Sequence, residues 1–152
     1  MTGVQTCALP ISPSAKILAG GGTLIFCAQD EPARSAPLRA AGADIIVLPN
    51  AAGKVELPDV LKELGRRGIN ELHVEAGAKL NGSLLREGCV DELLIYLAPS
   101  VIGDTGLGMF ALPPLAELAA KPRLQFIDVR KVGDDLRILA RVLRASAGRP
   151  SV

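Results

Sequence analysis

The sequence predicts an α/β domain with a mostly parallel sheet that ends in an antiparallel C-terminal hairpin. Short apolar runs alternate with amphipathic or polar segments through the first half of the chain, as in right-handed βαβ units. The last two apolar runs are instead separated by the tight turn Gly133-Asp134-Asp135, which favours a hairpin. A chain of 152 residues is long enough for one domain with a sizeable core.

The composition excludes several classes of protein. Apolar residues make up 49% of the chain and aromatic residues only 3%, so we expect an aliphatic core. No apolar run approaches the roughly 18 to 20 residues that span a bilayer, which argues against a membrane protein. The net charge is +1 without a basic stripe, so nucleic acid is not expected as a partner. The three cysteines lack metal-ligand spacing and predict a reducing, cytoplasmic setting.

The first eleven residues stand apart from the rest. They show neither a helix nor a strand period, and they lack the basic start of a secretory signal. The string resembles the conceptual translation of a sequencing-adapter oligonucleotide, so we expect residues 1–11 to be non-native and the natural protein to begin further upstream. The remaining chain then divides into a partial domain over residues 12–143 and a disordered tail over residues 144–152.

The elements before residue 50 follow from local pattern. Gly20-Gly21-Gly22 can cradle a phosphate or form a flexible turn, and the turn is favoured because no P-loop Lys-Ser/Thr follows. Residues 23–27 and 44–49 are continuous apolar runs typical of strands buried on both faces. A polar loop with two prolines is expected over residues 29–37, followed by a helical turn over residues 38–41 that ends at a glycine.

An amphipathic helix is predicted over residues 57–68. Val60, Leu61 and Leu64 share one face, Pro58 suits the first turn, and Gly65 or Gly68 suits the end. The elements predicted later in the chain are a strand over 93–99, a glycine-rich loop over 100–110 that can lie over a ligand, a helical turn over 115–120, and strands over 124–132 and 136–142.

The stretch from Glu71 to Gly88 organises this prediction. Residues 72–74 are expected to form a short buried strand that ends at Glu75, and a turn at Gly77 then leads into a helix that closes at Gly88. The first N–H groups of that helix favour an anion such as a phosphate. Two interpretations stay open on this pattern alone: a nucleotide site, or the small residues that any parallel sheet needs where a strand meets a helix.

Several segments together resemble a known family, the C-terminal reductase domain of the bifunctional riboflavin-biosynthesis deaminase–reductase. The residues that carry the resemblance are Val74-Glu75-Ala76-Gly77, Leu80, Ser83-Leu84-Leu85, Val90-Asp91-Glu92, Ala98-Pro99 and Gly103. The resemblance implies a dihydrofolate-reductase-like, three-layer α/β/α fold, so residues 12–143 would be a partial reductase domain. It implies that NADPH reduces the ribosyl group of 5-amino-6-(5-phosphoribosylamino)uracil, a phosphorylated pyrimidine, to ribityl. It also implies a cytoplasmic enzyme that is a homodimer when complete.

The resemblance also implies roles for particular residues. Glu75 matches the acidic position near the bound substrate, which agrees with its expected place at the carboxyl end of a strand. The positions that match the turn and helix start holding the cofactor phosphates are Gly77, Ala78, Lys79, Leu80, Asn81, Gly82 and Ser83. Lys79 has no fixed counterpart in the family, but a cation there would help to bind phosphate. Asp104 departs from the family, which often has a second glycine there. The segments that carry the nicotinamide and substrate-phosphate contacts, and the zinc-binding deaminase, would precede residue 12, so we assign neither a catalytic residue nor a metal site.

Other candidate residues are better explained by structure than by chemistry. His73 is expected to be a packed, hydrogen-bonded histidine in the strand in preference to a catalytic one. Asp91 and Glu92 can be an acid–base pair, but a role in a turn or a subunit contact is favoured. Cys27 and Cys89 are expected to behave as small buried hydrophobic residues.

Two other functions stay open. The chain can be another dihydrofolate-reductase-like NADPH reductase with a different substrate, because a cofactor turn does not specify what is reduced. It can also be an inactive fragment that keeps the fold but leaves a sheet edge unpaired.

Overall fold

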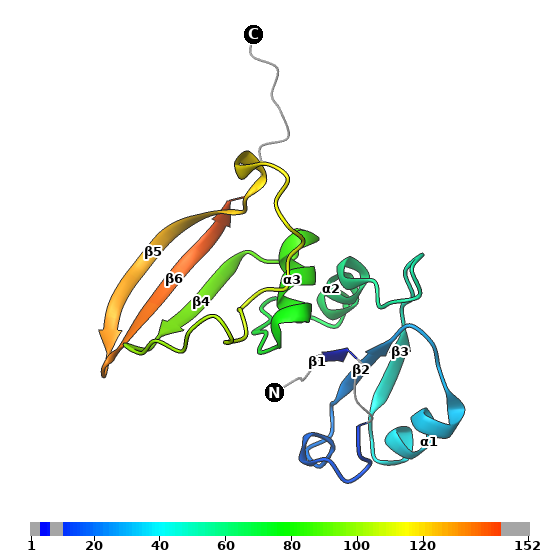
Figure 1. Ribbon diagram of the computed structural model, residues 1–152. Coiled ribbons are helices and arrows are strands. Elements are labelled where there is room, and N and C mark those ends of the chain that lie inside the picture. The colour runs from blue at the N-terminus through cyan, green and yellow to red at the C-terminus, as the bar shows by residue number, and fades with distance from the viewer. Residues whose placement is uncertain (1–3, 7–10, 144–152) are drawn as a thin grey trace. The chain divides into compact units, whose positions relative to one another are not determined.

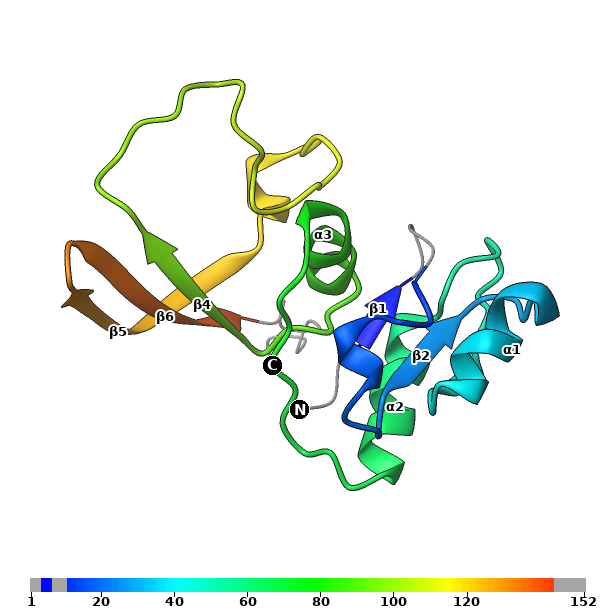
Figure 2. The same cartoon turned by 90° about the horizontal axis from the view of Figure 1, so that it is seen from below.

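A parallel sheet and an antiparallel sheet contain all the strands that the structure, a computed structural model, describes over residues 4–6 and 11–143. The chain divides after Glu75 into two compact units, Met1–Glu75 and Ala76–Val152, called here the first and second unit. Figures 1 and 2 show the elements of both. The predicted α/β fold is confirmed, with the parallel and antiparallel strands in two separate sheets.

The first unit is built on a parallel sheet in the order β1-β2-β3. Its elements are β1 (Val4–Thr6), the 3-10 turn η1 (Lys16–Leu18), β2 (Leu24–Cys27), α1 (Pro32–Ala40), β3 (Asp44–Val47) and α2 (Leu57–Arg66). The register pairs Leu24 with Asp44 and Cys27 with Val47. The predicted parallel βαβ arrangement is therefore present in this part of the chain.

The core of the first unit lies on both faces of β2. On one face Ile25 packs with Leu18, Leu38 and Ala43, and Leu38 comes from α1. On the other face Leu24 and Phe26 pack with two residues of α2, Val60 and Leu64. A continuous apolar strand is what this sandwich of helix, sheet and helix requires. The sheet of the first unit is thus the middle of three layers.

The α-helices α1, α2 and α3 all end in the same glycine motif. Gly42, Gly68 and Gly88 have φ values of 93°, 81° and 69°, in the left-handed region that favours glycine. In α2, the Ile69 N–H donates to the Leu64 carbonyl at 3.0 Å, and the equivalent bond closes the other two helices. The predicted glycine ends of these helices are confirmed.

The prediction for α1 is wrong at its start. The helix begins at Pro32 and runs through Pro37, where a loop was expected. Proline in a helix interior removes one hydrogen bond, but burial of Leu38 offsets that loss. An ion pair between Arg39 and Asp30, 2.8 Å between nitrogen and oxygen, also ties the helix to the residues before it.

Three of the first eleven residues form an edge strand of the sheet. Val4–Thr6 forms strand β1 and pairs in parallel with residues 24–26 of β2. The sequence of these three residues shows no strand period, so the pattern alone did not predict β1. The non-native origin of residues 1–11 stays a prediction. Residues 7–10 and the tail over 144–152 lie outside the described residues.

The expected strand over residues 72–74 is wrong. The chain from residue 69 to residue 77 is neither helix nor strand, and His73 and Val74 are exposed. A strand is defined by backbone bonds to a neighbour. No strand of the described residues pairs with this segment, so its apolar residues alone do not make it one.

The second unit combines one α-helix with an antiparallel sheet in the order β4-β6-β5. Its elements are α3 (Ala78–Arg86), β4 (Glu92–Leu97), the 3-10 turn η2 (Leu118–Ala120), β5 (Arg123–Val132) and β6 (Asp135–Leu143). β5 and β6 form the predicted hairpin, with a register shift between Phe126 and Asp128. None of the described helices is both long enough and apolar enough to cross a membrane.

Charged residues on the antiparallel sheet join its strands. Arg141 of β6 lies opposite Glu92 of β4, and the two side chains form an ion pair at 3.2 Å. Arg137 of β6 pairs with Asp128 of β5 at 2.8 Å. The backbone carbonyl of Asp91 accepts a hydrogen bond from the Val142 N–H. These contacts agree with the structural interpretation of Asp91 and Glu92.

Candidate functional site

The first turn of α3 is the part of the predicted site best suited to an anion. Gly77 precedes the helix in an extended conformation, and no side chain caps the helix start. The first turn contains no acidic residue. The N–H groups of residues 78–80 precede the first intrahelical bond, which joins the Asn81 N–H to the Gly77 carbonyl. Their partial positive charge and that of the helix dipole attract a phosphate.

The space beside Gly77 is open. A β-carbon added there would meet no atom within 4 Å, and its φ of −78° is one that any residue adopts. Neither backbone strain nor crowding among the described residues therefore requires glycine. The absence of a side chain leaves room for a ligand to approach the backbone. Lys79 is exposed in the same turn and adds a cation.

The seven predicted cofactor residues divide into three groups. Gly77, Ala78, Lys79 and Leu80 form the helix start. Ser83 lies one turn further on, where its hydroxyl accepts a hydrogen bond from Arg86 at 3.2 Å. Asn81 and Gly82 contact the chain around residues 109–111. The structure thus places four of the seven at the N-terminal end of α3.

Contacts between α3 and residues 109–111 could not be predicted from the local pattern. The Asn81 side chain donates to the Ala76 carbonyl at 3.0 Å and to the Met109 carbonyl at 3.3 Å. The Ala111 N–H donates to the Ala78 carbonyl at 2.8 Å. A β-carbon at Gly82 would collide with the backbone of Ala111. A glycine inside a helix is the one local signal of such a close approach.

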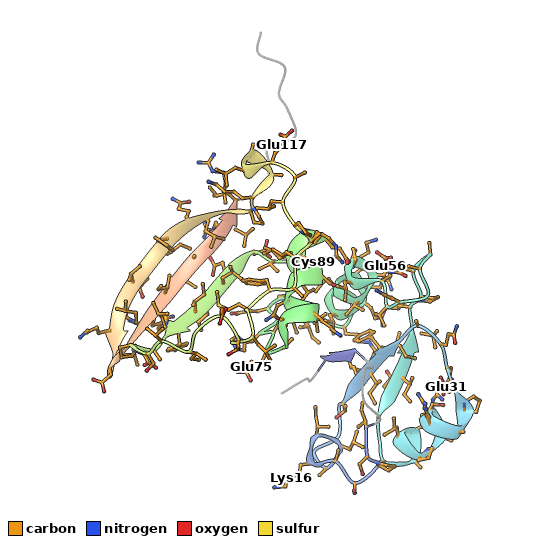
Figure 3. All side chains as sticks on the ribbon, in the orientation of Figure 1. Lys16, Glu31, Glu56, Glu75, Cys89 and Glu117 are labelled. Atoms are coloured by element: carbon orange, nitrogen blue, oxygen red, sulfur yellow. The ribbon has the colours of Figure 1, made fainter. Side chains whose placement is uncertain are left out.

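Glu75 lies at the end of the first unit and is labelled in Figure 3. Its side chain is 88% exposed, and its carboxylate lies 3.4 Å from Nε2 of His73. The expectation of a packed His73 is wrong, since its side chain is 68% exposed. The side chains of Glu75 and His73 therefore lie beside each other, and both are exposed to solvent. No strand of the described residues holds either of them.

The glycine-rich loop, residues 100–110, leaves β4 and returns beside α3 (Figure 2). Val101 and Leu107 are each 99% exposed, and Asp104 also faces solvent. The loop is thus accessible to a ligand along most of its length. That it covers one stays a prediction.

The remaining candidate residues, two glycines and two cysteines, lie where a structural role explains them. Gly21 and Gly22 have left-handed φ values in the turn that follows η1, which agrees with the favoured turn interpretation. Cys27 and Cys89 are half-buried, less than expected, and each thiol contacts a backbone carbonyl. Within residues 4–6 and 11–143, no three His, Cys, Asp or Glu side chains gather as a metal site.

Comparison with known proteins finds one family. A family model described as the RibD C-terminal domain matches residues 4–138. The chain is 34% identical over 126 residues to the riboflavin biosynthesis protein RibD of Escherichia coli, covering 83% of this chain and 34% of that protein. It is 30% identical over 86 residues to a 5-amino-6-(5-phosphoribosylamino)uracil reductase of Buchnera aphidicola, covering 57% of this chain and 42% of that protein.

The fold of this chain is similar to a solved structure of RibD from Acinetobacter baumannii. The TM-score is 0.77 with 21% sequence identity, over 94% of this chain and 37% of that one. This likeness concerns the fold alone. The chain spans about a third of the Escherichia coli relative and of this solved structure.

Proposed function

The chain belongs to the RibD C-terminal domain family, and from that premise we propose that it is part of an NADPH-dependent reductase of riboflavin biosynthesis. The proposed substrate is 5-amino-6-(5-phosphoribosylamino)uracil, the compound in the name of the Buchnera relative. The reaction converts the ribosyl group of this phosphorylated pyrimidine to ribityl. The cytoplasmic location and the homodimer stay predictions.

The observation that supports the cofactor most strongly is the uncapped start of α3. NADPH carries three phosphates, and the N–H groups of residues 78–80 have the partial charge to bind them. Lys79 adds a full charge, and Gly77 leaves space for close approach. These features fit a phosphorylated cofactor. When bound, NADPH supplies the hydride, and the residues of this chain bind and orient it.

Glu75 is proposed to bind the substrate. Its exposed carboxylate can accept hydrogen bonds from a pyrimidine N–H or a ribose hydroxyl. Nε2 of His73 lies 3.4 Å from this carboxylate. In the complete protein, Glu75→Gln is expected to weaken use of the substrate and to leave NADPH affinity nearly intact. Equal losses of both would contradict this role.

A titration of the 152-residue chain with NADPH tests the proposal. We expect millimolar NADPH to raise the unfolding temperature, because a ligand that binds only the folded state stabilises it. Lys79→Glu should abolish most of that rise by adding a negative charge beside the phosphates. The matched control is Lys16→Glu, a charge reversal at an exposed lysine of η1 (Figure 3). No stabilisation of the parent chain, or equal loss in both variants, would overturn the proposal.

A further inference from the structure

We propose that Asn81 is a positioning residue that fixes the glycine-rich loop on α3 and thereby sets the affinity for NADPH. This inference rests on the proposed function, because it concerns the same cofactor. It assigns Asn81 a role different from the direct phosphate contact that the resemblance implied. The Asn81 side chain bonds to the backbone of Ala76 and to the backbone of Met109. A ligand at the start of α3 would meet both stretches of backbone.

The hydrogen bonds of Asn81 show what it joins. A side-chain amide nitrogen has two N–H donors. Here both have acceptors: the Ala76 carbonyl before the turn at 3.0 Å, and the Met109 carbonyl in the loop at 3.3 Å. The nitrogen therefore has no donor left for a phosphate. Asn81 instead links the turn at Gly77 to a loop 28 residues further along the chain.

Two further contacts hold the same end of the loop. The Ala111 N–H bonds to the Ala78 carbonyl, one turn before Gly82. Gly82 is buried, and the backbone of Ala111 occupies the space that a side chain there would need. Glycine is among the least favourable residues for a helix interior. Its presence in α3 is explained by the close approach of residue 111.

The rest of the loop has little to hold it in place. Val101 and Leu107 are almost fully exposed, and the Gly106 N–H bonds locally to the Gly103 carbonyl. A segment with few buried contacts opens readily. The contacts at residues 109–111 therefore determine where the loop lies. Because Asn81 ties Met109 to Ala76, two residues before Ala78, it sets the loop position relative to the helix start.

The test measures loop opening and cofactor affinity in the same variants. Hydrogen exchange of the Ala111 amide reports the loop, and NADPH titration gives the dissociation constant. In Asn81→Ala we expect about tenfold faster exchange at Ala111, since two hydrogen bonds are lost. We expect the dissociation constant for NADPH to rise about three- to tenfold. Asn81→Gln, which keeps both amide donors, should restore part of the affinity, and Asn70→Ala at an exposed asparagine should change neither quantity.

The possible outcomes separate this inference from the proposed function. If the parent chain binds NADPH and Asn81→Ala binds it equally well, the inference is wrong and the proposed function stands. If the Ala111 exchange rate does not change, Asn81 does not fix the loop. If the parent chain binds no NADPH, both the proposed function and the effect on affinity fail. Should Asn81→Ala not fold, Asn81→Leu takes its place, because leucine has a similar size and no amide donors. An Ala111 exchange rate and an NADPH affinity equal to those of the parent chain in Asn81→Leu would overturn the inference.

Discussion

The two units bury apolar side chains to very different extents. In the first unit, Phe26 of β2 is fully buried against Val60 and Leu64 of α2. In the second unit, Phe126 in β5 is 66% exposed, although it also lies within a paired strand. Burial therefore stabilises the first unit, whereas backbone pairing and cross-strand ion pairs are prominent in the second. Strand pairing and core formation are separate contributions to stability. In this chain, burial is more prominent in the first unit and strand pairing in the second.

The largest difference in stability is expected between substitutions of the two phenylalanines. Phe26→Ala leaves a cavity among Leu24, Val60 and Leu64, and should lower the free energy of unfolding of the first unit by about 3 to 5 kcal/mol. Phe126→Ala removes an exposed ring and should cost less than about 1 kcal/mol. Urea unfolding followed by hydrogen exchange of β2 and β5 measures both. Equal costs would mean that the contrast in burial does not reflect stability.

A smaller difference in stability is expected between substitutions of two glycines inside helices. Gly82→Ala forces a methyl group against the backbone of Ala111 and should destabilise the second unit by about 1 to 3 kcal/mol. Gly65→Ala in α2 meets no atom within 4 Å and should instead stabilise the first unit by up to about 1 kcal/mol. Thermal unfolding of the two variants checks the opposite signs. A stabilising Gly82→Ala would show that residues 109–111 do not pack on α3.

The smallest expected effect is electrostatic and concerns the first unit. A hydrogen bond from Arg39 lowers the pKa of Asp30, and one from Arg67 lowers the pKa of Glu63. A carboxyl group with a lowered pKa in the folded state stabilises that state above its unfolded pKa. This contribution is lost as the pH falls through the folded pKa, so the first unit should weaken below about pH 4.

A substitution isolates the contribution of Asp30. Asp30→Asn removes the titrating group, so it should lower stability slightly at pH 7 and make the first unit less sensitive to acid. Unfolding midpoints measured from pH 7 to pH 3 check this. An unchanged pH dependence would show that the ion pair with Arg39 contributes nothing in solution.

The sequence predicts those features that depend on neighbouring residues or on burial on both faces. Gly42, Gly68 and Gly88 end helices because glycine readily adopts the left-handed backbone that closes the last turn. β2 is recognisable because both of its faces are covered, so every residue in it is apolar. The α/β fold follows from the order of such elements.

The features that could not be predicted depend on partners distant in the sequence. Residues 72–74 have the apolar pattern of a strand, but no described strand pairs with them. His73 is exposed for the same reason. Within the candidate site, the helix start at Gly77 was recognisable, whereas the contact between Asn81 and Met109 joins residues 28 positions apart. Only the glycine at position 82 indicated that another segment approaches α3 closely.

We propose that the cofactor phosphates bind at the start of α3. A nuclear magnetic resonance titration tests this proposal most directly. NADPH is added to the 15N-labelled chain, and the backbone amide signals of both units are followed. We expect saturable shifts concentrated at the amides of residues 78–80, with smaller shifts in Lys79→Glu at the same concentration of NADPH. Absence of shifts at these three amides in millimolar NADPH, or shifts confined to other residues, would contradict it.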